Sequence, residues 1–145
     1  MNQNEKYNTY SFLLERTARS VKQFAQRKFN ELGFEVTVDQ WQVLKVLYDH
    51  NDLNQREIAE LTYKDHPTLT RIIDLLCKKE LVERKMHPSD RRSFIIHLTE
   101  EGKAKVEFMK PQVAEIRTHA WHNLSDADFE EFKRILNTIY SNLSL

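Results

Sequence analysis

The chain has 145 residues, and its 22 Lys and Arg are balanced by 22 Asp and Glu, so its formal charge at neutral pH is zero. This length suits one domain, or a compact core with an extension. Two glycines and three prolines leave little material for repeated hairpins or phosphate-cradling loops, so we expect a mainly helical protein. The balanced charge argues against a nucleic-acid binder unless the basic residues are concentrated locally.

A single cysteine, Cys77, excludes an intrachain disulfide framework and a cysteine-rich zinc site. The N-terminus lacks the apolar region of a secretory signal, and no run approaches the roughly 20 apolar residues that cross a bilayer. We therefore expect a cytoplasmic protein with no membrane partner. No phosphate-binding loop and no nucleophile beside a His base stand out, so we predict neither an enzyme nor a cofactor.

Apolar residues at helical spacing from Tyr10 to Leu32 predict a long amphipathic first helix that stops at Gly33. Thr37 and Gln40 match a capping box, which predicts a second helix over about 38–49.

Asn54 and Glu57 match a second capping box, which predicts a short third helix. A fourth helix is expected to begin near Pro67 and to run to about Lys79 with its apolar residues on one face. The opposite face carries side chains that can bond to bases or neutralise phosphate: Thr68, Thr70, Arg71, Asp74 and Lys78.

Segments 81–86 and 94–98 are the only short stretches dominated by β-branched and aromatic residues, and they flank a turn-rich stretch. They predict one β-hairpin with Arg91 and Arg92 at a basic tip. Thr99, followed by two glutamates, is expected to cap a further helix.

Two long C-terminal helices are predicted, one kinked by Pro111 and one opened by Ser125 and Asp128. Their apolar residues step by three and four, as in a coiled-coil seam. These helices could fold back on the core of their own chain. A core of this size leaves them too little to pack on, so we favour burial by a partner chain. The predicted dimerisation residues are Val113, Ile116, Phe132, Leu136, Ile139 and Leu143.

A short helix, a turn, a helix with a polar face and a hairpin with a basic tip together make a winged helix-turn-helix. In this motif the second helix lies in the major groove, where Arg bonds to guanine and Thr offers a hydroxyl or methyl group. Arginines at a hairpin tip suit the narrower groove. The expected fold is mainly α with a small β-wing. Its predicted divisions are an N-terminal dimerisation helix (1–36), a DNA-binding domain (37–99) and C-terminal dimerisation helices (100–145).

Four segments carry a family resemblance: TVDQWQVLKVL, NQREIAELT, HPTLTRIIDLLCKKELVER and HPSDRRSFIIHLTEEGKA. Together they resemble the MarR (multiple antibiotic resistance regulator) family of bacterial winged-helix transcription factors, and the flanking helices agree in number and order. The resemblance implies a homodimer that binds an inverted-repeat DNA operator, usually as a repressor, and is released by a small molecule or by oxidation.

Carried over by position, the resemblance implies DNA-binding roles for residues of the third helix, the fourth helix and the wing: Gln55, Arg56, His66, Thr68, Thr70, Arg71, Asp90, Arg91 and Arg92. Asp90 is expected to hold Arg92 in shape through a charge-assisted bond. The family usually has Gly where this chain has Glu80, and a left-handed backbone there would cost on the order of 1 kcal/mol.

The resemblance also implies a pocket for a small aromatic or phenolic effector between the dimerisation helices and the winged domain. The candidates for its wall are Tyr10, Phe12, Phe34 and Trp41, which are equally good core residues. Cys77 is predicted to be an inert thiol, because the peroxide-sensing branch of the family has its reactive cysteine in the first long helix. His119 and His122 are expected at a surface or dimer interface, so no metal site is predicted.

The rival hypothesis is a helical protein-interaction module that keeps the winged fold and binds no DNA, which would show little salt dependence. The charge distribution favours DNA. Residues 64–92 hold eight basic and five acidic side chains, whereas the segments 36–63 and 93–145 are acidic. A neutral chain with this local basic excess is expected to bind non-specific DNA only modestly.

Overall fold

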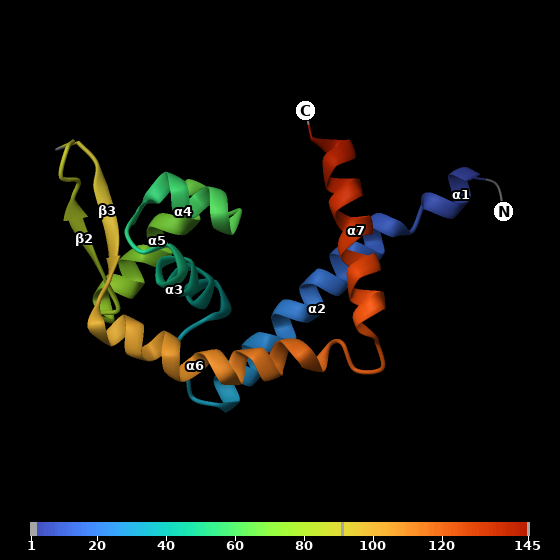
Figure 1. Ribbon diagram of the computed structural model, residues 1–145, viewed down its shortest axis with the longest axis horizontal. Coiled ribbons are helices and arrows are strands. Elements are labelled where there is room, and N and C mark those ends of the chain that lie inside the picture. The colour runs from blue at the N-terminus through green and yellow to red at the C-terminus, as the bar shows by residue number, and fades with distance from the viewer. Residues whose placement is uncertain (1–2, 91, 145) are drawn as a thin grey trace.

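The computed structural model describes residues 3–90 and 92–144, which form seven helices and three strands (Figure 1). In chain order they are α1 (Gln3–Tyr7), α2 (Tyr10–Glu31), α3 (Val38–His50), β1 (Leu53–Asn54), α4 (Gln55–Thr62), α5 (His66–Lys78), β2 (Val82–Met86), β3 (Phe94–Leu98), α6 (Glu100–His119) and α7 (Asp126–Leu143). The expected fold class, mainly helical with a small wing, is confirmed. The short helix α1 was not predicted.

The local signals in the sequence place the helix ends where they were expected. Thr37, Asn54 and Ser125 each form a complete capping box, in which the N-cap side chain and the N3 side chain bond to each other's backbone. Helix α2 ends at Glu31, and Gly33 follows its C-cap Leu32 with a φ of 67°, in the left-handed region that glycine adopts without strain. The chain then turns sharply, because the N–H of Phe34 donates to the carbonyl of Phe29 at 3.1 Å.

The sheet has three strands in the order β1-β3-β2, all antiparallel, where only the β2–β3 hairpin was predicted. The additional strand β1 is two residues long, and Leu53 pairs with Ile96 of β3. So short a strand leaves no periodic signal in a sequence. It anchors the start of α4 to the base of the wing.

The hydrophobic core lies in the winged region and extends past both predicted domain boundaries. Phe29 and Phe34 enter it from the N-terminal side, and Val106 and Met109 enter it from α6. Gly102 lets α6 approach the wing closely, because a Cβ there would collide with the carbonyl oxygen of Leu81 and a methyl group of Leu98. The first half of α6 is therefore part of the winged body.

The terminal helices leave large apolar side chains uncovered. Helix α7 buries no residue within the chain, and it lies beside the N-terminal half of α2, away from the winged domain (Figure 1). An apolar groove of about 470 Å³ runs between the two helices, lined by residues that include Tyr10, Phe132, Leu136 and Ile139.

Two of the six predicted dimerisation residues are covered within the single chain. Val113 is only 5% exposed and belongs to the core, and Ile116 packs against the same core. Val113 is covered by the core of the winged body, and Ile116 lies at its edge, where α6 crosses α2. Phe132 and Leu143 are exposed, and Leu136 and Ile139 are half-buried in the groove. Within residues 3–90 and 92–144, no helix is both long and apolar enough to span a membrane.

Candidate nucleic-acid interface

Helix α5 presents the predicted base-reading residues, and burial of its other face fixes its rotation. Four of its apolar side chains are buried: Leu69, Ile72, Ile73 and Leu76. Asp65 caps the helix by accepting the backbone N–H of Thr68 at 2.8 Å, and this bond holds the pKa of Asp65 below its ordinary value. On the opposite face Arg71 is exposed, and Thr68 and Thr70 are half-buried.

Gln55, His66 and Thr70 come together at the start of α5. The Gln55 amide donates to Thr70 Oγ1 at 2.6 Å and lies 3.3 Å from both ring nitrogens of His66. Thr70 Oγ1 in turn donates to the His66 carbonyl at 3.0 Å. The cluster joins the first residue of α4 to the first turn of α5, and it engages the Thr70 hydroxyl as both donor and acceptor. Arg56, the next residue of α4, is exposed.

The turn at the tip of the wing is shaped by Asp90. Its carboxylate accepts the backbone N–H of Arg92 at 2.9 Å and the hydroxyl of Ser93 at 3.2 Å. The bond is charge-assisted, as expected, because its acceptor is a carboxylate, and its donor is the Arg92 backbone. Arg92 is exposed, and Arg91 lies outside the described residues.

Arg84, which sequence reasoning missed, joins the wing to α5. Its guanidinium pairs with Asp74 at 2.6 Å and donates to the Cys77 sulfur at 3.6 Å. Asp74 is therefore engaged with the wing. No sequence signal pairs residues ten positions apart across a helix and a strand. Burial raises the pKa of the Cys77 thiol above its ordinary value, which disfavours the reactive thiolate.

Glu80 links α5 to the wing with a φ of 63°, so the left-handed backbone usual for glycine is present here with a larger side chain. The Thr99 hydroxyl donates to the Glu80 carbonyl at 2.8 Å. This bond and the β2–β3 hairpin hold residue 80 in the left-handed conformation, which strains the backbone of a residue that has a Cβ.

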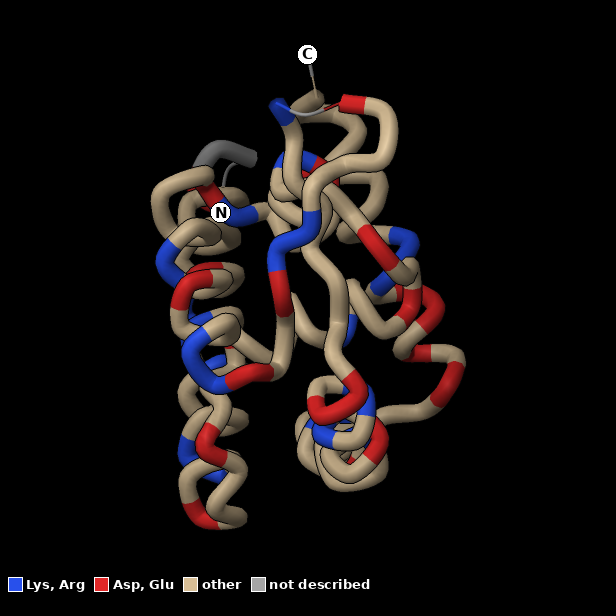
Figure 2. Tube along the Cα trace, turned by 90° about the vertical axis from the view of Figure 1, so that its left-hand side faces the viewer, with Lys and Arg blue, Asp and Glu red and all other residues tan. Residues whose placement is uncertain are grey.

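The basic residues of segment 64–92 do not all face outward. Lys64 pairs with Asp39 of α3, and Lys79 donates to Gln40 of the same helix. Figure 2 shows Lys and Arg mixed with Asp and Glu along the whole chain. The exposed basic groups on the candidate surface include Arg56, Arg71 and Arg92.

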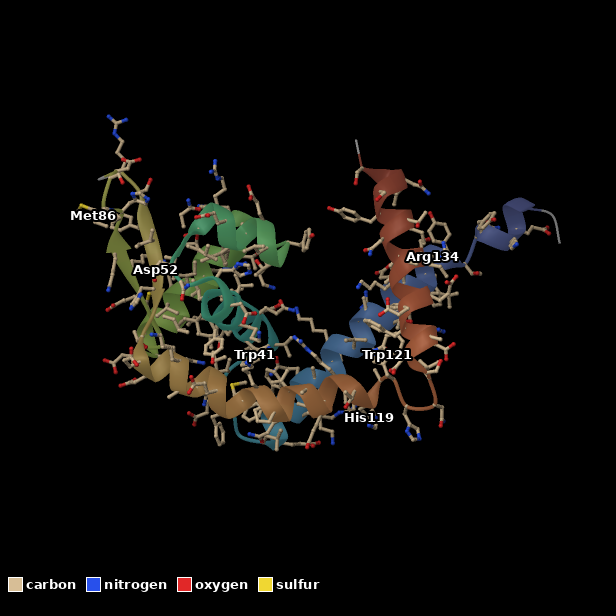
Figure 3. The ribbon with its side chains drawn as sticks, in the orientation of Figure 1. Trp41, Asp52, Met86, His119, Trp121 and Arg134 are labelled. Carbon is tan, nitrogen blue, oxygen red and sulfur yellow. The ribbon has the colours of Figure 1, made fainter. Side chains whose placement is uncertain are left out.

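The four aromatic residues predicted to line an effector pocket do not meet in one cavity of the single chain. Phe34 and Trp41 are 1% and 2% exposed and belong to the core. Tyr10 lines the α2–α7 groove, and Phe12 is 62% exposed. Trp41 lies within the winged body (Figure 3), and its indole N–H is buried with no hydrogen-bond partner among the described residues. The four lie apart because the core draws in Phe34 and Trp41, whereas the N-terminal half of α2 projects away from it.

His119 stacks on Phe24 of α2 with their ring centroids 4.7 Å apart, so it serves the contact between α6 and α2. His122 is exposed in the turn that follows. Over the part of the chain that the structure describes, no cluster of three or more His, Cys, Asp or Glu side chains is arranged to hold a metal ion.

These elements define a winged helix-turn-helix: α4, a turn, an α5 with a polar outer face, and a three-stranded wing with Arg92 at its tip. The model of the MarR family matches residues 36–94. The chain is 30% identical over 107 residues to the HTH-type transcriptional repressor YetL of Bacillus subtilis, covering 72% of this chain and 64% of that protein.

Two further relatives match almost the whole chain. The organic hydroperoxide resistance transcriptional regulator of Bacillus subtilis is 27% identical over 136 residues, covering 94% of this chain and 88% of that protein. The solved structure of an S. aureus MepR–DNA complex superposes with a TM-score of 0.84 at 30% identity, covering 93% of this chain and 98% of that one. The chain belongs to the MarR family of transcriptional regulators.

Proposed function

We propose that the protein is a homodimeric repressor that binds a double-stranded DNA operator containing an inverted repeat. Helix α5 enters the major groove, and the wing enters the flanking minor groove. The observation that carries the proposal is the surface made by the exposed face of α5 and the wing tip, where Arg71 and Arg92 are exposed on a protein whose formal net charge is zero. MepR, a relative of the same fold, is solved in complex with DNA.

The hydrogen bonds within the site give each residue a different role in DNA binding. Arg71 is free to bond bidentately to a guanine. Because its hydroxyl is engaged by Gln55 and His66, Thr70 offers its methyl group to a thymine. Gln55 and His66 hold α5 in place. Thr68 contacts a base where the N-terminal end of α5 enters the major groove.

The outer contacts are with the DNA backbone and the minor groove. Arg56 bonds to phosphate beside α4. At the wing tip, Arg91 and Arg92 enter the minor groove, where the negative potential attracts guanidinium groups. Asp90 keeps the turn in shape through the Arg92 backbone.

The second chain of the dimer covers the apolar groove between α2 and α7. This groove is lined almost entirely by apolar side chains, and such a surface is unfavourable in water unless a partner buries it. In this arrangement the dimer surface comes from α2 within 1–36 and from α7 within 100–145, whereas 37–99 binds DNA. Two recognition helices related by the two-fold axis would meet half-sites roughly 34–36 Å apart.

In this proposal the protein acts by binding alone, in the cytoplasm, where bacterial operator DNA lies. The proposal also includes release of the protein from DNA by a small aromatic or phenolic effector. A thermal-shift screen of phenols and aromatic carboxylates, followed by DNA binding with any compound that raises the melting temperature, tests this part.

The DNA-binding proposal is tested first by selecting bound sequences from random DNA. We expect an inverted repeat. A dimer that makes 6–10 phosphate contacts should then lose roughly 10³–10⁵ in affinity between 50 and 200 mM salt. No enrichment, together with little salt dependence, would refute the proposal and favour a protein-interaction module.

Two arginine variants separate base reading in the major groove from electrostatic attraction in the minor groove. Arg71→Ala should relax the preference at one base position at a cost of about 1–3 kcal/mol. Arg92→Ala should weaken all sequences alike and reduce the salt slope by about 1. Lys45→Ala is the matched control, because Lys45 lies on α3 and pairs with Asp49 at 2.6 Å. Equal loss across all sequences for Arg71→Ala would contradict its assignment to base reading.

A further inference from the structure

The first turn of α3 is a point where three parts of the molecule are bonded together through Asp39. One carboxylate oxygen pairs with Lys22 of the dimerisation helix α2 at 2.9 Å. The other oxygen pairs with Lys64, in the turn between α4 and α5, at 2.8 Å. Lys64 directly precedes Asp65, the N-cap of the recognition helix, so a single side chain connects α2 with the start of α5.

A second set of bonds holds the other end of α5 at the same place. Lys79, the C-cap residue of α5, donates to the Gln40 side chain at 3.0 Å and to the Glu35 carbonyl at 2.5 Å. On the side of α2, Gln26 accepts the backbone N–H of Val38 at 2.9 Å. Both ends of the recognition helix are thus bonded to residues 35–40, and these residues are bonded to α2.

The Asp39 bridge is partly shielded from water, which makes it stronger than an ordinary surface pair. The Lys64 side chain is 11% exposed and the Asp39 side chain is 31% exposed. Partial burial by itself would raise the pKa of Asp39, but the hydrogen bonds and charges of Lys64 and Lys22 outweigh it and hold that pKa below its ordinary value. Asp39 is therefore ionised at neutral pH.

We propose that Asp39 is a positioning residue for DNA recognition, which through Lys22 and Lys64 sets the orientation of α5 on α2 and thereby the half-site spacing that the dimer accepts. This inference rests on the proposed function, because spacing has meaning only for a dimer on an inverted repeat. Each added base pair moves a half-site along the DNA by about 3.4 Å and rotates it by about a tenth of a turn. A small change in the angle between α5 and α2 thus displaces the recognition helix by an amount comparable with a one-base-pair change in half-site spacing.

The experiment measures the affinity of purified full-length protein for inverted repeats with identical half-sites and spacers changed by one or two base pairs. The wild type should show one optimum spacing. Asp39→Asn should reduce the discrimination between that optimum and its neighbours by about fivefold or more, the lower range of measured coupling between sites. Base preference within each half-site should stay unchanged, because no base-reading residue is altered.

Asp49→Asn is the matched control, since Asp49 lies on the same helix in an exposed pair with Lys45 and should keep the wild-type profile. Lys64→Met should reproduce the effect of Asp39→Asn, and combining the two should add little. Asp39→Glu, which restores the carboxylate, should recover part of the discrimination, whereas a purely structural role would show only as a lowered melting temperature.

An Asp39→Asn variant that keeps the wild-type spacing profile would overturn the inference while leaving the proposed function intact. A wild type that binds no inverted repeat would overturn the proposed function and the inference together. If Asp39→Asn fails to fold, Lys22→Gln, which removes only the exposed arm of the bridge, decides in its place by the same spacing profile.

Discussion

Replacing Glu80 with glycine should make the protein more stable, although the change removes a side chain and enlarges the freedom of the unfolded chain. Glu80 has a φ of 63° at the link between α5 and the wing. Its backbone N–H donates to the Cys77 carbonyl at 2.9 Å, and its carbonyl accepts from Thr99 at 2.8 Å. Glycine keeps both bonds.

The size of the gain follows from two opposing effects. A left-handed backbone costs a residue with a Cβ about 1–2 kcal/mol, and glycine avoids this cost. Glycine also adds about 0.4–1 kcal/mol of unfolded-state entropy that folding must overcome. The net stabilisation should lie between about 0 and 1.6 kcal/mol, centred near about 0.8 kcal/mol, which corresponds to a rise of up to roughly 6 °C in melting temperature for a chain of this length.

The assay is thermal and urea unfolding at one fixed protein concentration, because the stability of a dimer depends on concentration. Glu80→Ala is the essential control, since alanine removes the carboxylate but keeps the Cβ and its strain. Asn123→Gly is a second control at another left-handed position, with a φ of 67°. Its gain should be smaller, because asparagine tolerates this backbone better.

A Glu80→Gly variant no more stable than Glu80→Ala would exclude backbone strain as the cause. That result would mean that the side chain of residue 80, rather than its backbone, determines the energy of the link. A gain of equal size for both variants would point to relief of charge repulsion among the neighbouring glutamates.

Three other predictions follow from the packing and the charges. Gly102→Ala should destabilise the fold by about 1–3 kcal/mol in urea unfolding, because its Cβ would overlap the Leu81 carbonyl; an alanine that stabilises the helix would contradict this packing. The folded-state pKa of Asp39 is lowered, so its bridge contributes stability fully above the unfolded value of about 3.9 and loses it as the pH falls through the lower folded value. The stability difference between the wild type and Asp39→Asn should therefore vanish at acid pH, and a constant difference from pH 7 to pH 2 would exclude this cause. Leu136→Glu, in the α2–α7 groove, should shift the protein to monomer in analytical ultracentrifugation and weaken binding to the full inverted repeat; an unchanged dimer would show that another surface pairs the chains.

Much of the fold is determined by short-range patterns in the sequence. The capping boxes at Thr37, Asn54 and Ser125 predicted helix starts that the structure confirms, because an N-cap and its N3 partner lie within one turn. The buried stripe of α5 and the β2–β3 hairpin follow in the same way from spacing and turn residues. The family resemblance singled out Glu80, which stands where the family usually has Gly, and the structure shows the left-handed backbone there.

The sequence by itself therefore determined the order of the helices, the hairpin and the polar face of α5, because each depends on residues a few positions apart. Tertiary structure alone decided the burial of Val113, the Arg84 pair with Asp74, and the bridge that Asp39 makes to Lys22 and Lys64. The partners in these ion pairs lie 10 to 25 positions apart in the sequence. They meet because packing of the core fixes the angles at which α2, α3 and α5 cross. No periodicity along the chain encodes that angle.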